Sequence, residues 1–177
     1  MKEIEVKLPV KDFKEVKGLL KKLKAKKKFK ETLERNILFD HKSLKLKERD
    51  WVLRLRQFGE KNILTLKTKS IGRKGFKVRE EVNIFFEDFE KMKEVFQRMG
   101  FFEAFYYEKY REEYELNGLS ISLDKTPVGN YVEIEGDYKK IENFLKKIGA
   151  KIEETLSLSY FQLFRIFNKK SKRMQFK

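Results

Sequence analysis

Apolar and polar residues alternate along most of this chain, which is the pattern of strands with one buried face. At the N-terminus, Ile4 and Val6 fall on one face of such a strand, while Glu3, Glu5 and Lys7 fall on the other. The same alternation predicts seven further strands, over residues 32–39, 51–58, 62–69, 76–86, 106–116, 119–124 and 131–135. Because short turns join most of these strands, they indicate an antiparallel sheet and an α+β fold.

Helical spacing of apolar residues interrupts the strand pattern in three places. Asp12, Asp88 and Asp137 each precede an amphipathic segment, and a short polar side chain there can cap the free backbone N–H groups of a helix. We therefore predict helices near residues 12–24, 87–100 and 137–149, which cover the apolar face of the sheet. A further helix is predicted from about Ser157 to Phe167.

The polar face of the predicted sheet is charged on nearly every strand. Strand by strand it carries Glu3, Glu5 and Lys7; Arg54 and Arg56; Thr65, Lys67 and Lys69; Arg79 and Glu81; Lys109, Arg111 and Glu113; Ser120, Ser122 and Asp124; and Glu133 and Glu135. The opposite face carries Ile4, Val6, Leu53, Leu55, Leu64, Leu66, Val78, Val82, Ile121, Leu123, Val132 and Ile134. A face built only for solvent would mix Thr, Ser, Gln and Lys, whereas here the charged residues dominate and their signs are segregated by strand. If the sheet curls or closes, these residues line a charged channel.

Basic and acidic rows on one surface match the chemistry of a polyphosphate and its metal. Arg offers a two-pronged donor to phosphate oxygens, and Lys offers a point charge. Carboxylate pairs such as Glu133 and Glu135 supply the hard oxygen ligands that Mg²⁺ or Mn²⁺ prefers. Since a divalent metal between carboxylates and phosphates offsets their repulsion, the charged face predicts a polyphosphate site.

The composition also points to an anionic partner. The 177 residues include 43 Lys and Arg against 28 Asp and Glu, which gives a formal net charge of +15. The absence of cysteine excludes disulfides and thiolate metal sites. No apolar run reaches the length of a membrane span and no signal-peptide pattern opens the chain, so we expect a soluble, cytoplasmic protein that binds no membrane. We expect one domain over residues 1–168 and a solvated basic tail over residues 169–177.

Other chemistries find little support. His41 is the only histidine and is expected at the surface, which argues against a histidine-centred triad or a zinc site. The chain contains no P-loop or Rossmann motif and no RNA-binding signature. The basic loop from Ser70 to Gly75 is either a solvated turn or a lid over an anionic ligand, and the sequence leaves both open.

The order of short motifs resembles that of the CYTH superfamily, the triphosphate tunnel metalloenzymes, over nearly the whole chain. The matching motifs are ExExK at 3–7, ERNILFD at 34–40, LRLR at 53–56, LTLK at 64–67, REE at 79–81, KYR at 109–111, LD at 123–124, GNYVEIE at 129–135 and SYxxL at 159–163. One such motif is weak, whereas all of them in order are specific. The resemblance implies an eight-stranded antiparallel β-tunnel, a closed barrel with a charged interior and helices packed outside.

The resemblance also implies roles for the charged residues. The triphosphate ligands would be Lys7, Arg54, Arg56, Lys67, Arg79, Lys109 and Arg111. The ligands of Mg²⁺ or Mn²⁺ would be Glu3, Glu5, Glu81, Asp124, Glu133 and Glu135. The residues expected to act most directly in catalysis are Glu5, Glu135 and Lys7.

Three positions depart from the family pattern. Asn83 stands where many members have a further Glu, which bears on metal affinity. Ser70 follows Lys69 where Gly-Pro is common, and Asn130 stands where a bulky residue is usual. The departure at Ser70 concerns the loop and not the chemistry.

Two reactions fit such a site. We expect hydrolysis of a nucleoside triphosphate, tripolyphosphate or another organic triphosphate ahead of the class IV adenylyl cyclase reaction, in which the ribose 3′-hydroxyl of ATP displaces pyrophosphate. Cyclisation requires a nucleoside pocket, and the charged face shows no base-reading residue. Animal thiamine triphosphatases carry a tunnel-facing Trp at the position of Val52, whereas Trp51 here falls on the opposite face, so dedicated thiamine stacking has little support.

A third hypothesis is a polyanion- or RNA-binding protein without chemistry. It accounts for the positive charge but leaves the carboxylate pairs unexplained, because a binder of phosphates gains nothing from them. We therefore expect a small-molecule triphosphate as the partner, not a nucleic acid. The sequence leaves open whether the protein is a monomer or a homodimer.

Overall fold

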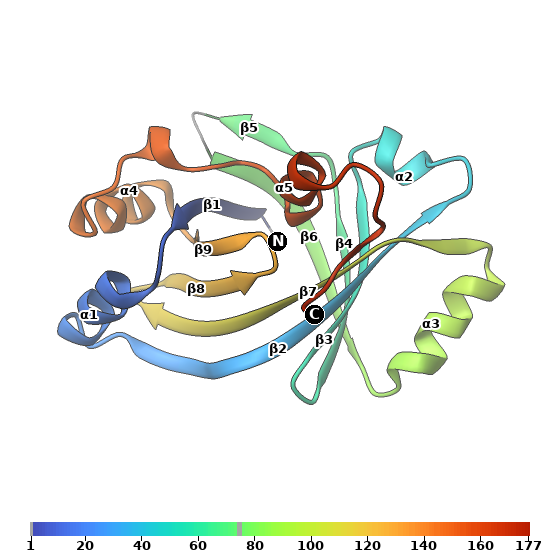
Figure 1. Cartoon of the computed structure of the whole chain (residues 1–177), viewed down its shortest axis with the longest axis horizontal. Coiled ribbons are helices and arrows are strands. Elements are labelled where there is room, and N and C mark those ends of the chain that lie inside the picture. Colours follow the sequence, from blue (N-terminus) through green and yellow to red (C-terminus); the bar gives the residue numbers. More distant parts are fainter. Residues whose placement is uncertain (1, 74–75) are drawn as a thin grey trace.

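The computed structural model describes residues 2–73 and 76–177 and shows a barrel with helices around it (Figure 1). The strands in these residues are β1 (Lys2–Val10), β2 (Lys26–His41), β3 (Val52–Phe58), β4 (Lys61–Lys67), β5 (Ile71–Arg73), β6 (Phe76–Phe86), β7 (Phe101–Leu116), β8 (Leu119–Thr126), β9 (Gly129–Glu135) and β10 (Arg173–Met174). The helices are α1 (Lys14–Lys22), α2 (Lys45–Glu48), α3 (Phe89–Arg98), α4 (Tyr138–Lys147) and α5 (Tyr160–Phe167), with a 3₁₀ turn at Ile152–Glu154. None of the helices in this part of the chain has the length and apolarity needed to cross a bilayer.

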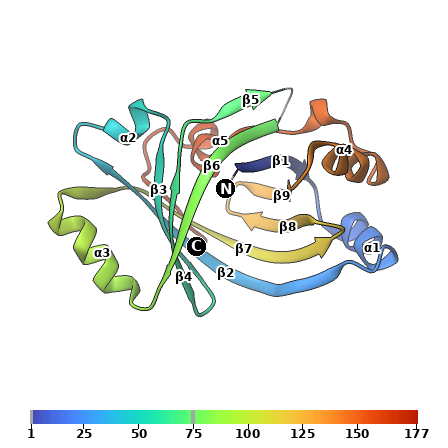
Figure 2. The same cartoon turned by 180° about the vertical axis from the view of Figure 1, so that it is seen from behind.

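Eight strands close into an antiparallel barrel in the order β1-β9-β8-β7-β2-β3-β4-β6, and pairing of β6 with β1 completes the ring. At the closure, Glu3 on β1 lies opposite Arg79 on β6, and Glu5 lies opposite Glu135 on β9. The ring is seen from both sides in Figures 1 and 2, with α1 and α4 beside β1, β8 and β9 and with α3 at the far end. The predicted α+β fold and eight-stranded antiparallel tunnel are confirmed.

The apolar face of the sheet packs under helices as the alternation predicts. α1 and α4 pack on β1, β8 and β9 around Ile121, Val132, Ile134 and Ile141, all fully buried. α3 covers β2 and β3 mainly through the buried Phe96. Complete burial of one such side chain contributes about 1.5–3 kcal/mol to stability. These contacts turn the charged face of the sheet to the inside of the barrel.

The outer face of β4 and β6 is an exception. The alternation places Val82 on the buried face, yet it is 58% exposed, and Ile84 on the same strand is 54% exposed. The reason is that α3 packs on a cluster formed by Ile37, Phe39 and Leu55 of β2 and β3. Alternation identifies a face of a strand, but it does not say whether another element covers that face.

β2 and β7 are each 16 residues long and exceed their predicted ranges. The first part of β2 contains Lys26, Lys27 and Lys28, which hide any apolar alternation, and its side chains there are exposed. Pairing with β7 holds this segment, with register shifts along the ladder and an ion pair of 2.7 Å between Lys28 and Glu115. The long β2–β7 ladder forms one wall of the barrel.

Two strands lie where the sequence predicts none. β5 forms inside the basic loop and pairs with β6, while Lys74 and Gly75 of that loop lie outside the described residues, so the lid stays a prediction. β10 lies within the predicted basic tail and runs parallel to β7. Lys169 and Lys170 are exposed as expected, but Met174 is only 1% exposed because it packs with Phe105. The C-terminal segment is therefore docked on the barrel.

Candidate functional site

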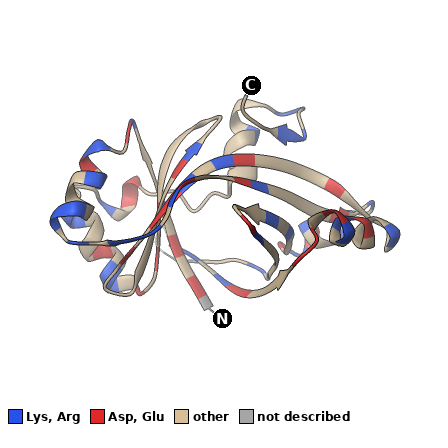
Figure 3. Ribbon diagram, turned by 90° about the horizontal axis from the view of Figure 1, so that it is seen from below, with Lys and Arg blue, Asp and Glu red and all other residues tan. Residues whose placement is uncertain are grey.

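The charged face encloses a cavity of about 790 Å³ inside the barrel. Figure 3 shows basic and acidic positions side by side on the strands that form it. The cavity is lined by every predicted triphosphate ligand, namely Lys7, Arg54, Arg56, Lys67, Arg79, Lys109 and Arg111. It is also lined by the predicted metal ligands Glu3, Glu5, Glu81, Glu133 and Glu135. The barrel therefore brings twelve of the thirteen predicted site residues to one cavity, and the exception is Asp124.

Asp124 is fully buried behind this lining and accepts four hydrogen bonds from protein donors. Arg111 donates to both of its oxygens, from Nε at 2.7 Å and from Nη2 at 2.6 Å. Lys109 Nζ donates at 2.8 Å and the Tyr160 hydroxyl at 2.6 Å. Burial alone would raise the pKa of Asp124, but Arg111 and Lys109 lower it. These contacts anchor Lys109, Arg111 and helix α5, and the metal-ligand role that the resemblance implies for Asp124 stays a prediction.

The cations on β3 and β4 are held by polar side chains from other strands. Arg54 Nη2 donates to Thr65 Oγ1 at 3.3 Å, and Arg56 Nε donates to Asn36 Oδ1 at 3.2 Å. Lys67 Nζ lies 2.6 Å from carboxylate oxygens of both Glu3 and Glu81. Such fixed donors inside a partly enclosed cavity suit phosphate oxygens, because their orientation is set before an anion arrives.

A cluster of carboxylates occupies the part of the cavity formed by β1 and β9. Burial and neighbouring carboxylates raise the pKa of Glu3 to about 7, despite Lys67, and burial together with Glu3 and Glu133 raises the pKa of Glu135 to about 7. Burial would also raise the pKa of Glu5, but Lys7 and other lysines hold it below its ordinary value. Burial is the largest cause of both raised pKa values and the neighbouring carboxylates add to it, so a divalent cation, which stabilises the ionised carboxylates, fits this donor set.

The carboxylates are not already arranged around a metal position. Among the described residues, no three acidic or histidine side chains lie close enough together to hold an ion as they stand. Glu133 is instead engaged by two cations, at 2.8 Å from Lys7 Nζ and 2.7 Å from Arg111 Nη2. To hold an ion between them, Glu3, Glu5 and Glu135 would therefore have to rearrange.

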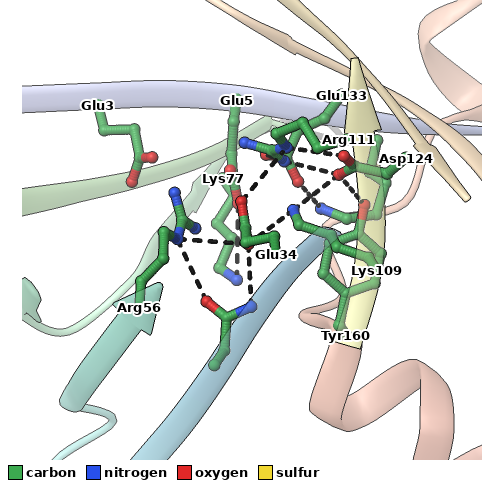
Figure 4. A network of polar contacts seen from close by, with 12 residues as sticks. Glu3, Glu5, Glu34, Arg56, Lys77, Lys109, Arg111, Asp124, Glu133 and Tyr160 are labelled. Carbon is green, nitrogen blue, oxygen red and sulfur yellow. Dashed lines mark hydrogen bonds and ion pairs between the residues drawn. The ribbon is translucent and has the colours of Figure 1, made fainter. Parts of the chain in front are cut away.

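The sequence analysis did not assign Lys77, Glu34 or Asn36 to the site. Lys77 lines the cavity 3.7 Å from Glu5, and burial lowers its pKa to about 8. It lies two residues before Arg79, so strand parity could have found it. Glu34 lies among Arg56, Lys109 and Arg111 (Figure 4), which hold its pKa well below the ordinary value in spite of burial. Glu34 shares the parity of Asn36 on its strand, so the same alternation could have placed both on the inner face.

The cavity changes from charged to apolar along neighbouring strands. In order, the lining residues are Arg111, Lys109, Tyr107 and Phe105 on β7, and Arg56, Arg54 and Val52 on β3. Leu38 on β2, Phe102 on β7 and Phe161 on α5 complete the apolar part. Trp51 also lines it, whereas its parity predicts the opposite face. The reason is that β3 begins at Val52, so alternation does not fix the direction of Trp51.

Comparison with known proteins agrees with this architecture. The family model of the CYTH domain matches residues 1–163 of this chain. A Methanocaldococcus jannaschii protein, provisionally named an adenylate cyclase, is 30% identical over 92% of this chain and 98% of its own length. A Pyrococcus horikoshii protein of solved structure is 26% identical with a TM-score of 0.76, covering 91% of this chain and 98% of that one. A Hippeastrum protein, provisionally called an adenylyl cyclase and described by a dominant triphosphatase activity, shares the fold with a TM-score of 0.69 at 21% identity, covering 94% and 96%. The chain belongs to the CYTH domain family.

Proposed function

We propose that this protein is a divalent-metal-dependent enzyme that hydrolyses a triphosphate, with an organic triphosphate as the substrate. The observation that carries the proposal is one cavity whose walls present Arg and Lys from five strands against a cluster of carboxylates on β1 and β9. A binding protein for anions has no use for those carboxylates. CYTH proteins are metal-dependent in general, which supports a cation as the partner of the carboxylates.

In this proposal the basic residues bind and orient the phosphates. Arg54 and Arg56 on β3 and Lys109 and Arg111 on β7 contact phosphate oxygens from two sides, and Lys7 does so beside the carboxylates. This fixes the chain of phosphates along the cavity, and positioning supplies much of the rate enhancement in phosphoryl transfer.

Glu3, Glu5 and Glu135 are the residues that would hold Mg²⁺ or Mn²⁺, with Glu81 and Glu133 beside them. When bound, such an ion supplies Lewis acidity to phosphate oxygens and water. Glu5 and Glu135, opposite each other on paired strands, are proposed to orient the attacking water. Tyr160, hydrogen-bonded to Asp124, closes the wall and limits access of bulk water.

The apolar part of the cavity supports an organic group on the phosphates. Aromatic and aliphatic side chains line much of the space beyond Arg54, together with Arg165 and Lys172, and they offer contacts that an organic group can use and tripolyphosphate cannot. The same space makes the cyclase reaction the second candidate, because a nucleoside bound there could present a hydroxyl to the α-phosphorus. The triphosphatase activity of the Hippeastrum protein favours hydrolysis over cyclisation.

The test is an assay of the purified protein with ATP, GTP, thiamine triphosphate and tripolyphosphate, each with Mg²⁺, Mn²⁺ or EDTA. Phosphate and cyclic AMP are measured in parallel. We expect metal-dependent phosphate release, faster from an organic triphosphate than from tripolyphosphate. Cyclic AMP as the main product from ATP would replace hydrolysis by cyclisation. No turnover of any triphosphate with either metal would refute the proposal.

A further inference from the structure

Glu34 is a buried carboxylate that lies behind the cationic wall of the cavity. Its side chain is 0% exposed, and it is not one of the residues that line the cavity, whereas Arg56, Lys109 and Arg111 around it all are. Glu34 Oε1 lies 3.3 Å from Arg56 Nε and 3.5 Å from Lys109 Nζ, and Oε2 lies 3.8 Å from Arg111 Nε. Figure 4 shows the carboxylate between Arg56 and the pair on β7. Glu34 therefore joins cations from two strands.

Glu34 is held more loosely than Asp124, the other carboxylate behind this wall. It accepts a hydrogen bond of 2.9 Å from Asn36 Nδ2, while its buried Oε2 has no hydrogen-bond partner among the residues that the structure describes. Asp124 accepts four. Since the cations lie at ion-pair distances from Glu34 without good hydrogen-bond geometry, its main effect on them is electrostatic.

We propose, on the basis of the proposed function, that Glu34 is an internal counter-ion of the triphosphate site that stabilises the free protein and weakens its binding of polyphosphate. In the free barrel, the carboxylate attracts both Arg56 and the β7 cations and so offsets the repulsion between them. When phosphates bind to those cations, the fixed negative charge of Glu34 remains close by and opposes the ligand.

A counter-ion of this kind has a functional consequence. It keeps a strongly basic cavity from binding every phosphate compound tightly, because part of its charge is already neutralised. A ligand must carry enough negative charge to overcome the fixed carboxylate, which favours triphosphates and promotes release of products with fewer phosphates. Glu34 is thus a positioning residue that acts through Arg56, Lys109 and Arg111, not on the substrate.

The test uses Glu34→Gln, which keeps the side-chain size and removes the charge. Thermal unfolding and calorimetric binding of tripolyphosphate are measured in EDTA, so that neither metal nor turnover enters. We expect a lower Tm for the free variant, a larger upward Tm shift on adding tripolyphosphate than in wild type, and a Kd on the order of tenfold lower. The gain should be smaller for pyrophosphate.

Glu112→Gln is the matched control, because Glu112 is a buried carboxylate on the outside of the same strand wall, paired with Lys17 and Lys27. It should lower Tm equally with and without tripolyphosphate and leave the Kd unchanged. Asn36→Asp provides a change of opposite sign should Glu34→Gln fail to fold. A second negative charge beside Glu34 should weaken tripolyphosphate binding.

Unchanged or weaker binding in Glu34→Gln, or unchanged or tighter binding in Asn36→Asp, would overturn the inference. So would the lack of any tripolyphosphate binding by wild type and variants alike. Tighter binding by Glu34→Gln in a protein that cleaves no triphosphate would keep the inference and refute the proposed function. Normal triphosphate turnover by Glu34→Gln with unchanged tripolyphosphate binding would keep the proposed function and overturn the inference.

Discussion

Asp124 and Glu135 are carboxylates on neighbouring strands of one barrel, yet their surroundings are opposite. Asp124 on β8 accepts hydrogen bonds from Lys109, Arg111 and Tyr160, and its pKa is lowered. Glu135 on β9 lies beside Glu3 and Glu5, and burial with neighbouring carboxylates raises its pKa to about 7. The first carboxylate is neutralised by the protein, and the second lies where negative charge is in excess.

This difference indicates different roles for Asp124 and Glu135, although the sequence motifs place both among the metal ligands. A buried anion already surrounded by donors fixes those donors in place and has less acceptor capacity to offer a metal. A cluster of crowded carboxylates is stabilised by whatever brings positive charge to it, and a divalent cation does so most effectively. Metal binding should therefore depend on the β1–β9 cluster, while stability and the phosphate-binding geometry should depend on Asp124.

The largest expected effect is on turnover by variants of the carboxylate cluster. Glu135→Gln and Glu5→Gln each replace a charged oxygen ligand by a neutral group of the same size. Metal-dependent turnover should fall more than about 100-fold, since even residues behind metal ligands commonly matter 10–100-fold. Phosphate release under saturating Mg²⁺ is the measurement, with circular dichroism to confirm the fold. Full activity in both variants would place the metal elsewhere.

Stability should respond in the reverse order. Asp124→Asn leaves buried Lys109 and Arg111 without their main counter-ion and should cost about 3–5 kcal/mol in the free energy of unfolding. Glu135→Gln in metal-free protein should cost little, because it relieves repulsion with Glu3. Urea unfolding in EDTA measures both. Equal losses would show that the two carboxylates are not in different electrostatic states.

A smaller effect, on KM, distinguishes the phosphate-binding residues from the apolar part of the cavity. Arg56→Ala should raise KM for all triphosphates by about 10–100-fold, because it removes a charged hydrogen-bond donor shared by every substrate. Phe161→Ala is the matched change in the apolar part and should raise KM for organic triphosphates while sparing tripolyphosphate. If Phe161→Ala left KM for organic triphosphates unchanged, the organic group would lie outside this part of the cavity.

The smallest effect is a pH dependence that metal removes. A carboxyl group whose folded pKa exceeds its unfolded value binds protons more tightly in the folded state. Its contribution to stability is therefore present at low pH and is lost as pH rises from the ordinary value of 4.5 to about 7 for Glu3 and Glu135. Metal-free Tm should include this decline, and Glu135→Gln should reduce it. Saturating Mg²⁺ should remove it, and a decline of the same size with metal would contradict the assignment.

Period-2 alternation of charged and apolar residues predicts the strands and their charged face, and the resemblance to the CYTH superfamily implies that the sheet closes into a barrel around that face. Alternation placed Lys7, Arg54 and Arg111 on a common face, and the closed sheet brings them to one cavity. Alternation could not show that Asp124 pairs with Arg111 and Lys109. Ion pairing across strands depends on the strand register, which alternation does not determine. The roles of these residues stay predictions until they are measured.

Features outside the alternation were harder to predict. Trp51 precedes its strand and turns toward the cavity, and Met174 docks on β7 from a segment rich in lysine. Val82 has the pattern of a core residue without an element to cover it. In each case the decisive information is a contact between distant segments, which local patterns do not contain.

Mn²⁺ binding by wild type, Glu135→Gln and Asp124→Asn, measured by electron paramagnetic resonance at a temperature where all three are folded, tests the central claim most directly. The account predicts that Glu135→Gln weakens Mn²⁺ binding by at least about tenfold, while Asp124→Asn retains wild-type affinity. Wild-type affinity in Glu135→Gln together with loss of binding in Asp124→Asn would contradict it.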